Sequence, residues 1–335
     1  MKKKILITGA CGFIGSHLVE KLAKNKNYDV TALCYYNSSN SIGNLTYINK
    51  KLQKKIRIIF GDIRSEDLTT NITKNKDIVV HLAALISIPY SYVSPKSYID
   101  TNIVGTYNIL NSCKNNSVKK IIITSTSEVY GTAQYVPIDE KHPLNSQSPY
   151  AASKVAADQI ALSFKKSFNL PVLVARPFNT FGPRQSARAI IPTLITQMIN
   201  QKNFIKVGNI NTKRDFTYID DTINGFMKLI NSNKLNVDVV NIASGFEIEI
   251  KNLIKIISNQ LDIKKLKIVF DKKRIRPKNS EVYRLLASNK KIKKIYKWQP
   301  RYKNASNFSD AISKTIEWFK LNKKISSSSF DDYNI

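Results

Sequence analysis

The sequence has few cysteines, few histidines and no long apolar run. Its three cysteines, Cys11, Cys34 and Cys113, are odd in number and widely spaced among 335 residues. Their spacing predicts neither a zinc site nor a disulfide framework, and no metal is expected. No apolar run approaches the roughly 18 residues that a membrane span requires, and the apolar stretch after Met1–Lys4 is too short for a secretory signal. These absences favour a reduced, cytoplasmic protein with no membrane contact.

Acidic residues are also scarce. There are 24 of them against 53 basic residues, which gives a formal net charge of +29. Ten of the basic residues are arginines, so 43 (53 − 10) are lysines, and these lysines are spread over the whole chain. Nucleic-acid-binding proteins rely on arginine for base contacts and on interleaved aromatics for stacking. We therefore interpret the charge as a bias in residue usage that attracts small anions, and nucleic-acid binding is not expected.

Short β-branched runs alternate with helical stretches in the first half of the chain. This alternation predicts βαβ units and a parallel sheet. Beyond Pro177, helical stretches mix with short strands, which indicates a second and smaller lobe. The predicted strands cover residues 4–7, 30–33, 56–60, 78–81, 120–124, 172–176, 239–242 and 267–270, and the predicted helices cover residues 15–24, 99–114, 150–168, 190–201, 220–231 and 304–321.

A glycine-rich turn with the spacing Gly9-x-x-Gly12-x-x-Gly15 follows the first predicted strand and opens a helix. Glycines let backbone N–H groups approach a pyrophosphate, and the helix N-terminus adds partial positive charge. The turn predicts a dinucleotide site and, with the alternation, an α/β fold: a Rossmann-type doubly wound parallel sheet with a smaller mixed α/β substrate-binding lobe. We expect residues 1–176 to form the NAD(P)-binding domain, residues 177–322 mainly the interleaved substrate-binding lobe, and residues 323–335 a flexible tail.

Tyr150 and Lys154 stand four residues apart in a predicted helix that Pro149 can begin. Side chains with this spacing share one helix face. An ammonium group near a phenol lowers the phenol's pKa, so Tyr150 is expected to act as a base near neutral pH. His81, at the end of a predicted strand, is expected to be a core residue.

Thr126, Ser127 and Glu128 follow the predicted strand at residues 120–124. Carboxyl ends of strands face the ligand in an open parallel sheet. Thr126 can hydrogen-bond the substrate. A carboxylate is not needed for alcohol oxidation by a tyrosine, so Glu128 indicates a second proton transfer. The alternative is that Glu128 only caps or pairs locally.

Together these motifs resemble the extended short-chain dehydrogenase/reductase family, whose NAD-dependent epimerase/dehydratase members act on sugar nucleotides, over about residues 3–320. The resemblance implies a homodimer through residues 99–114 and 150–168. It implies catalytic roles for Thr126, Ser127, Glu128, Tyr150 and Lys154. It implies cofactor contacts at Gly9, Gly12, Phe13, Ile14, Gly15, Asp62, Ile63, Leu82, Ala83, Ala84, Asn102, Tyr150, Lys154 and Phe178, and substrate contacts at Ser87, Asn179, Arg188, Arg214 and Arg276.

The choice between NAD and NADP depends on the end of the second strand. Family members often place an acid there to hold the adenosine ribose, but residues 32–37 contain none, and no Lys or Arg follows before Lys50. NAD is favoured because an unpaired 2′-phosphate is the costlier misfit. NADP stays open.

The reaction depends on Ser127 and Glu128. Most 4,6-dehydratases carry Thr-Asp-Glu where this chain has Thr-Ser-Glu, whereas 4-epimerases generally lack the Glu. Residues 179–192 most resemble the 4,6-dehydratases of legionaminic acid biosynthesis, which act on nucleotide-linked N-acetylglucosamine. The resemblance implies that a GDP- or UDP-linked sugar becomes a 4-keto-6-deoxy sugar through C4 oxidation, loss of water across C5 and C6, and hydride return. A UDP-glucuronate decarboxylase, a 4-epimerase and a non-catalytic dinucleotide-sensing protein remain alternatives.

Overall fold

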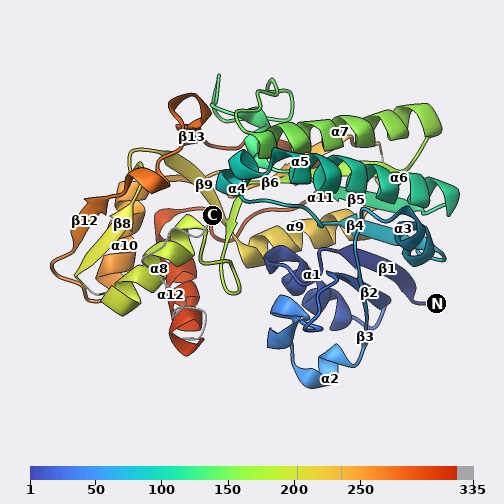
Figure 1. Ribbon diagram of the computed structural model, residues 1–335, viewed down its shortest axis with the longest axis horizontal. Helices are drawn as coiled ribbons and strands as arrows, with labels where there is room; N and C mark the ends of the chain where they lie inside the picture. Colours follow the sequence, from blue (N-terminus) through green and yellow to red (C-terminus); the bar gives the residue numbers. More distant parts are fainter. Residues whose placement is uncertain (202, 235, 323–335) are drawn as a thin grey trace.

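Seven strands form a parallel sheet in the order β10-β6-β5-β4-β1-β2-β3 (Figure 1). The computed structural model describes residues 1–201, 203–234 and 236–322, so the predicted tail lies outside the described residues. Every pairing in the sheet is parallel. The strands are β1 (Lys3–Thr8), β2 (Tyr28–Tyr35), β3 (Ile56–Gly61), β4 (Ile78–His81), β5 (Lys120–Thr124), β6 (Val172–Pro177) and β10 (Val239–Ile242).

Helices cover both faces of this sheet, because its isoleucine- and valine-rich strands are buried on both sides. On one face lie α1 (Phe13–Ala23) and α9 (Ile219–Asn231), and on the other lie α3 (Glu66–Thr73), α6 (Gly105–Asn115) and α7 (Pro149–Phe168). The predicted doubly wound α/β fold is confirmed. Shorter elements complete this part: η1 (Gly43–Tyr47), α2 (Lys50–Gln53), α4 (Ile88–Val93), α5 (Pro95–Tyr98), η2 (Ile99–Val104) and η3 (Ser127–Tyr130).

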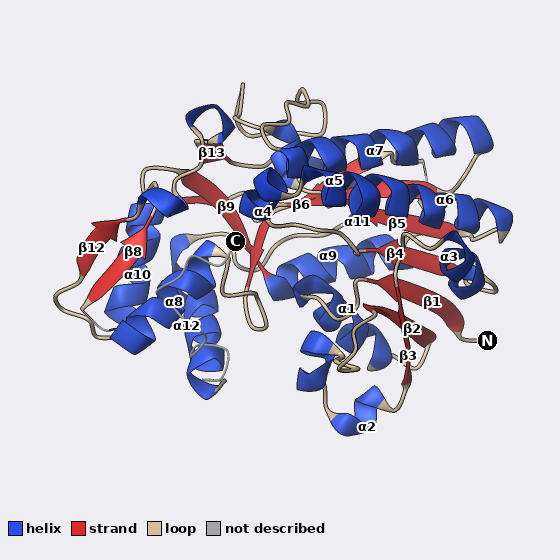
Figure 2. Ribbon diagram, in the orientation of Figure 1, coloured by secondary structure: helices blue, strands red, loops and turns tan. Residues whose placement is uncertain are grey.

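The second lobe packs against one end of the sheet (Figure 2). One apolar cluster holds both Ile5 of the large sheet and Phe308 of the last helix, so the two lobes share a core. The boundary at residue 176 stays a prediction. The lobe contains β7 (Asn179–Phe181), β8 (Phe204–Val207), β9 (Lys213–Tyr218), β11 (Glu247–Glu249), β12 (Lys267–Phe270), β13 (Arg284–Leu285), α8 (Ile190–Gln201), α10 (Ile250–Gln260), α12 (Ala305–Leu321), η4 (Lys272–Arg274) and η5 (Lys278–Ser280), while α11 (Lys290–Tyr296) lies beside β10.

The helix predicted over residues 99–114 differs from the structure in its first part. Residues Ile99–Val104 form a π-helical segment, and the α-helix begins only at Gly105. The segment turns Asn102 fully inward, where its side chain holds the backbone of Leu85. This tertiary contact is not visible in the apolar periodicity from which the helix is predicted.

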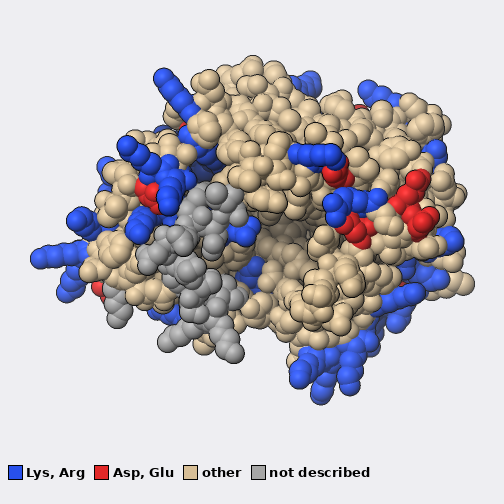
Figure 3. All heavy atoms as spheres, viewed as in Figure 1, with Lys and Arg blue, Asp and Glu red and all other residues tan. Residues whose placement is uncertain are grey.

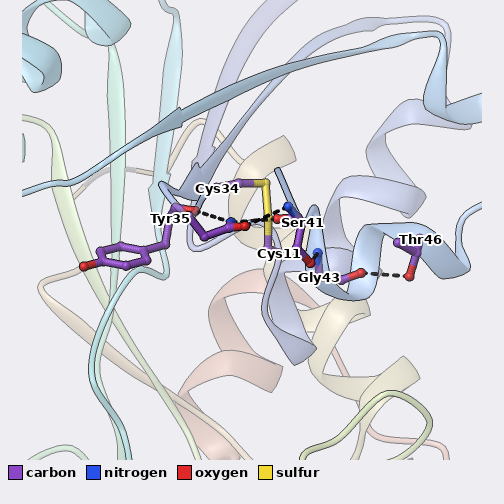
Figure 4. Close-up of a disulfide and its surroundings, with 7 residues drawn as sticks. Cys11, Cys34, Tyr35, Ser41, Gly43 and Thr46 are labelled. Carbon is purple, nitrogen blue, oxygen red and sulfur yellow. Dashed lines mark hydrogen bonds between the residues drawn. A yellow bond between two sulfur atoms is a disulfide. The ribbon is translucent and has the colours of Figure 1, made fainter. Parts of the chain in front are cut away.

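The cysteines correct a second prediction. Cys11 and Cys34 form a disulfide, although the sequence predicts no disulfide framework (Figure 4). Thr8 of β1 pairs in register with Leu33 of β2, and this pairing brings the two cysteine Cα atoms to 5.4 Å, within the range that a disulfide can bridge. Cys113 is a free thiol whose burial raises its pKa.

The net charge is carried by dispersed side chains. In Figure 3 Lys and Arg form several separate groups around the rim of the face, and a hollow lies between the two lobes. No helix among the described residues is long and apolar enough to cross a membrane. Within the same residues, no group of three His, Cys, Asp or Glu side chains could hold a metal ion.

Reduction of the disulfide is expected to lower the free energy of unfolding by about 2–4 kcal/mol, because the bridge restricts the unfolded chain between two residues 23 positions apart. Thermal and urea unfolding with and without dithiothreitol measure this change. A Cys11→Ser/Cys34→Ser double variant serves as the control, and its stability should not respond to the reductant. Equal stability of the oxidised and reduced wild-type protein would contradict the expectation.

Candidate active site

The turn between β1 and α1 forms a cradle of bare backbone. Gly9 has a φ of +66°, and a Cβ there would lie 2.6 Å from the Ala83 nitrogen. A Cβ on Gly15 would lie 2.2 Å from the Gly9 carbonyl oxygen. Gly12 caps α1, followed by Phe13 and Ile14 in the first helical turn. The turn thus leaves backbone without side chains at the start of α1, as the prediction of a phosphate-binding turn requires.

An open hollow of about 500 Å³ lies beside Asp62, one of the predicted cofactor residues. Asp62, Arg64, Ser65, Asp100 and Val104 line it. Burial opposes ionisation of Asp62, but hydrogen bonds from Arg64, with an Nη2–Oδ2 distance of 2.5 Å, hold the pKa of the carboxyl below its usual range. An ionised Asp62 at this position can accept a hydrogen bond from an amino group.

The loop after β4 crosses beneath the glycine turn. The backbone nitrogens of Leu82 and Ala83 donate to Thr8 Oγ1 at 3.2 Å, and Ala84 continues the loop. Asn102 holds the loop further along, at Leu85, and donates to Ser153 Oγ of α7 at 2.9 Å. Asn102 therefore fixes the loop to α7.

Two other predicted cofactor residues are buried. Ile63 is in the core, and its side chain occupies the space that a Cβ on Gly105 would need. The centre of the Phe178 ring lies 6.2 Å from the centre of the Tyr130 ring. Both belong to apolar clusters of the core.

His81 is a core residue, as the sequence predicts. It is 1% exposed, and its ring nitrogens lie 2.7 Å from Thr8 Oγ1 and 3.2 Å from Thr106 Oγ1. Burial, with the nearby positive charge of Lys154, lowers its pKa to about 3. His81 is thus neutral at physiological pH.

Tyr150 lies at the start of α7, which Ser148 caps by accepting from the Ala151 nitrogen. Its side chain is buried and forms a hydrogen bond with Thr126. The expectation that a neighbouring ammonium makes Tyr150 more acidic is not met, because burial raises its pKa and the charge of Glu128 adds to this effect. The hydrogen bond from Thr126 acts in the opposite direction.

Lys154 explains the discrepancy. Its Nζ donates to the carbonyl oxygen of Thr124 at 2.7 Å, so the ammonium is anchored at the end of β5. Burial lowers the pKa of Lys154 to about 8, and the charge of Asp158 opposes this effect. Helical spacing places Tyr150 and Lys154 on one face, but the β5 carbonyl determines where the ammonium lies.

Glu128 belongs to a cluster of charged side chains at the mouth of the site. Its Oε2 lies 3.5 Å from Arg276 Nη1, and its backbone nitrogen donates to Thr126 Oγ1 at 3.2 Å. Arg214 Nη2 lies 3.6 Å from Glu281 Oε1. Burial lowers the pKa of Arg214 to about 10, with Glu128 acting to raise it. The structure thus brings Glu128 together with Arg214 and Arg276, two of the predicted substrate-contact residues.

The remaining predicted substrate residues lie around Tyr98 and β7. Tyr98 packs edge-on against Tyr150 at 6.1 Å and donates to the carbonyl oxygen of Ser87. Burial raises the pKa of Tyr98 to about 12, and the positive charge of the exposed Arg188 opposes this effect. In β7, Asn179 Nδ2 is buried and has no hydrogen-bond partner among the described residues. An orphaned donor of this kind suits a ligand oxygen.

The sequence analysis missed Ser125, Asp158 and Arg176 as site residues. Asp158 lies four residues beyond Lys154, so helical spacing places it on the same face of α7. Ser127, which the sequence did predict, is buried beside Glu128 in η3. Helical spacing could have indicated Asp158 from the sequence. The sequence does not show, however, that this carboxylate is fully buried.

Comparison with known proteins assigns this architecture to a family. The family model described as GDP-mannose 4,6 dehydratase matches residues 6–310. A putative UDP-glucose 4-epimerase of Methanocaldococcus jannaschii is 32% identical over 326 residues, which cover 96% of this chain and 99% of that protein.

Solved structures agree. The dTDP-glucose 4,6-dehydratase DesIV of Streptomyces venezuelae, solved with NAD bound, matches with a TM-score of 0.85 and 26% identity over 96% of this chain and 98% of its own. The UDP-N-acetylglucosamine 4-epimerase of Methanobrevibacter ruminantium M1 matches with a TM-score of 0.84 and 32% identity over 96% and 100%. The chain therefore belongs to the extended short-chain dehydrogenase/reductase family, in the NAD-dependent epimerase/dehydratase group of nucleotide-sugar enzymes.

Proposed function

We propose that this protein is an NAD-dependent nucleotide-sugar 4,6-dehydratase. Its substrate would be a GDP- or UDP-linked N-acetylglucosamine-type hexose, of the kind used in legionaminic acid biosynthesis. The observation that carries the proposal is Glu128, a carboxylate whose charge acts on Tyr150 across the site. A tyrosine and lysine alone suffice for reversible oxidation of an alcohol, whereas elimination of water also needs a base for a carbon-bound proton.

The glycine cradle and the hollow beside Asp62 support NAD as the cofactor, and relatives solved with NAD bound share the fold. The turn is the feature that fits the dinucleotide: side chains on Gly9 or Gly15 would clash with the backbone that packs against it, and Gly12 leaves the start of α1 without a side chain. When bound, NAD supplies the reversible oxidation at the sugar C4 and a positive charge near Tyr150. Lys154 is positioned to hold its nicotinamide ribose.

In the proposed reaction, Tyr150 removes the proton from the sugar O4. The hydrogen bond with Thr126 holds the Tyr150 side chain in place. The carbonyl formed at C4 acidifies the C5 proton, and Glu128 removes that proton. The C6 hydroxyl then leaves as water, with a proton from Glu128 itself or from a water held by Ser127. The hydride removed from C4 then returns to C6, and a solvent proton is added at C5, which gives the 4-keto-6-deoxy sugar and restores the oxidised dinucleotide.

The diphosphate is assigned to Arg214 and Arg276, which can grip phosphate oxygens in pairs. Asn179 offers its orphaned Nδ2 to the same ligand. Ser87 is assigned to the sugar because its carbonyl oxygen accepts from Tyr98, which packs against Tyr150. Arg188, whose charge acts on Tyr98, is assigned to the same substrate. A cytoplasmic location and the absence of nucleic-acid binding stay predictions of the sequence.

Product analysis tests the reaction. Incubation with GDP- and UDP-N-acetylglucosamine should give a product lighter by one water.

Glu128→Gln should retain C4 oxidation, seen as reduced dinucleotide by absorbance, but lose water elimination and the exchange of C5 hydrogen with D₂O. Tyr150→Phe should abolish both steps, with a loss of about 100-fold or more. Glu66→Gln and Tyr107→Phe, both away from the site, are matched controls.

Three outcomes contradict this proposal. Loss of carbon dioxide from UDP-glucuronate would identify a decarboxylase. A product of unchanged mass and altered C4 configuration would identify an epimerase, to which this chain is similar in sequence. Binding of dinucleotide without turnover of any sugar nucleotide would identify a sensing protein.

Alanine substitutions in the glycine turn test the cofactor assignment. A Cβ on Gly12 meets only the Gly9 carbonyl oxygen, at 3.2 Å, so Gly12→Ala should fold with nearly unchanged stability. It should nevertheless bind NAD at least about tenfold more weakly, a loss of about 1.4 kcal/mol, because the backbone can no longer approach the pyrophosphate. Gly9→Ala should instead destabilise the fold. Calorimetric NAD titration and thermal unfolding separate the two effects; wild-type NAD affinity in Gly12→Ala would count against the site.

We also propose a homodimer formed through the face of η2, α6 and the end of α7. Large apolar side chains are exposed there, namely Ile99, Val104, Tyr107 and Phe168, each 42–52% exposed. An apolar patch of this kind on a helix pair suits burial against a second copy. Light scattering should give twice the monomer mass, and Tyr107→Glu should give a monomer. Phe270→Glu, a similar change on exposed β12, should remain dimeric; a monomeric wild type would refute the interface.

A further inference from the structure

A buried ion pair lies behind the catalytic tyrosine and lysine. Asp158, on α7 one turn beyond Lys154, has no exposed surface. Its Oδ2 accepts from Ser125 Oγ at 2.9 Å and from Arg176 Nε at 3.0 Å, and Arg176 Nη2 also lies 2.9 Å away. Ser125 lies at the end of β5 and Arg176 lies in β6, so one carboxylate ties three elements together.

The same pair reaches the segment that carries Glu128. Arg176 Nη1 donates to the Tyr130 hydroxyl at 3.0 Å, and its guanidinium lies 4.9 Å from the centre of the Tyr130 ring. The Tyr130 hydroxyl in turn donates to Asn241 Oδ1 at 2.8 Å. Tyr130 ends η3, the four-residue turn that also holds Ser127 and Glu128. A continuous buried connection therefore runs from α7, which carries Tyr150, to η3.

We propose that Asp158 and Arg176 are positioning residues, which align the redox pair on α7 with Glu128 on η3 and keep the Lys154 side chain protonated. The alignment of Glu128 rests on the proposed dehydration, whereas the effect on Lys154 does not. Replacing a buried ion pair by apolar side chains is often neutral or stabilising, so stability alone does not account for this pair.

The charges around Lys154 favour this role. The groups whose charges interact with that of Lys154 are Asp158 on α7 and the neutral His81 on β4, and Arg176 on β6 is paired with Asp158. Burial lowers the pKa of Lys154 to about 8, and Asp158 is the group that opposes this effect. Asp158 Oδ1 is buried with no hydrogen-bond partner among the described residues, so its charge is not fully satisfied by Arg176 and Ser125.

The sign of the pH effect follows. Without the carboxylate, Lys154 loses its proton at a lower pH than about 8. Activity that needs the ammonium must then fall at a lower pH, which moves the alkaline limb of the kcat profile towards acid. A purely structural loss would reduce kcat or stability at every pH and leave the limb in place.

The experiment compares Asp158→Asn with wild type in the full chain. We expect the alkaline limb to move by about one pH unit towards acid, and kcat near pH 8 to fall about fivefold from the loss of the ammonium alone. The titration of Lys154 in cofactor-free protein, followed by ¹³C-lysine NMR and assigned by the resonance missing in Lys154→Gln, should shift in the same direction. Asp158→Glu should restore most of both values. Glu20→Gln, which breaks the Arg184–Glu20 pair elsewhere, should move neither.

The outcomes separate this proposal from the proposed function. An unshifted Lys154 titration together with an unmoved alkaline limb would overturn the positioning role. The NMR titration needs no substrate, so it remains decisive if the protein is an epimerase. If Asp158→Asn fails to fold, the double variant Asp158→Leu/Arg176→Met replaces the pair by apolar groups. Wild-type kcat and an unmoved limb in that variant would overturn the role, and an impaired, shifted profile would support it.

Discussion

The parallel direction of the seven large-sheet strands is the constraint on which the site depends. Because all of these strands end at the same edge, the glycine turn after β1, the loop after β4, the turn that carries Glu128 after β5 and Asn179 after β6 meet in space. The strands can lie parallel because helices bury both faces. The second lobe adds Arg214 and Arg276 from the opposite side, and the shared core of the two lobes fixes that placement.

Buried acids have a special importance in a chain with so few of them. Asp158 joins α7, β5 and β6, and Asp215 joins β9 to the segments after β10 and β13 by accepting from Ser244, Gly245 and Ala287. Burial raises the pKa of Asp215 to about 6, although these hydrogen bonds oppose the effect. The abundant lysines lie mostly on the surface, whereas these carboxylates lie at junctions on either side of the site.

Much of the fold and part of the site were predictable from local patterns. Alternating β-branched and helical segments place every large-sheet strand within two residues at either end, because buried strands need a continuous apolar run. The glycine spacing predicts a tight turn, and the structure shows the positive φ that such a turn requires at Gly9. By contrast, the Cys11–Cys34 bridge depends on the register of β1 with β2, which no cysteine spacing reveals.

The sequence by itself determined the fold class and the glycine turn, and it singled out Tyr150, Lys154 and Glu128 as the groups proposed to carry the chemistry. These follow from short-range rules: strand period, helical spacing and glycine conformation. Only the tertiary structure decided how those groups are charged and held. The ammonium of Lys154 lies on a β5 carbonyl, and Asp158 and Arg176 support it from behind. Burial and distance set electrostatics, and both depend on contacts between residues far apart in the chain.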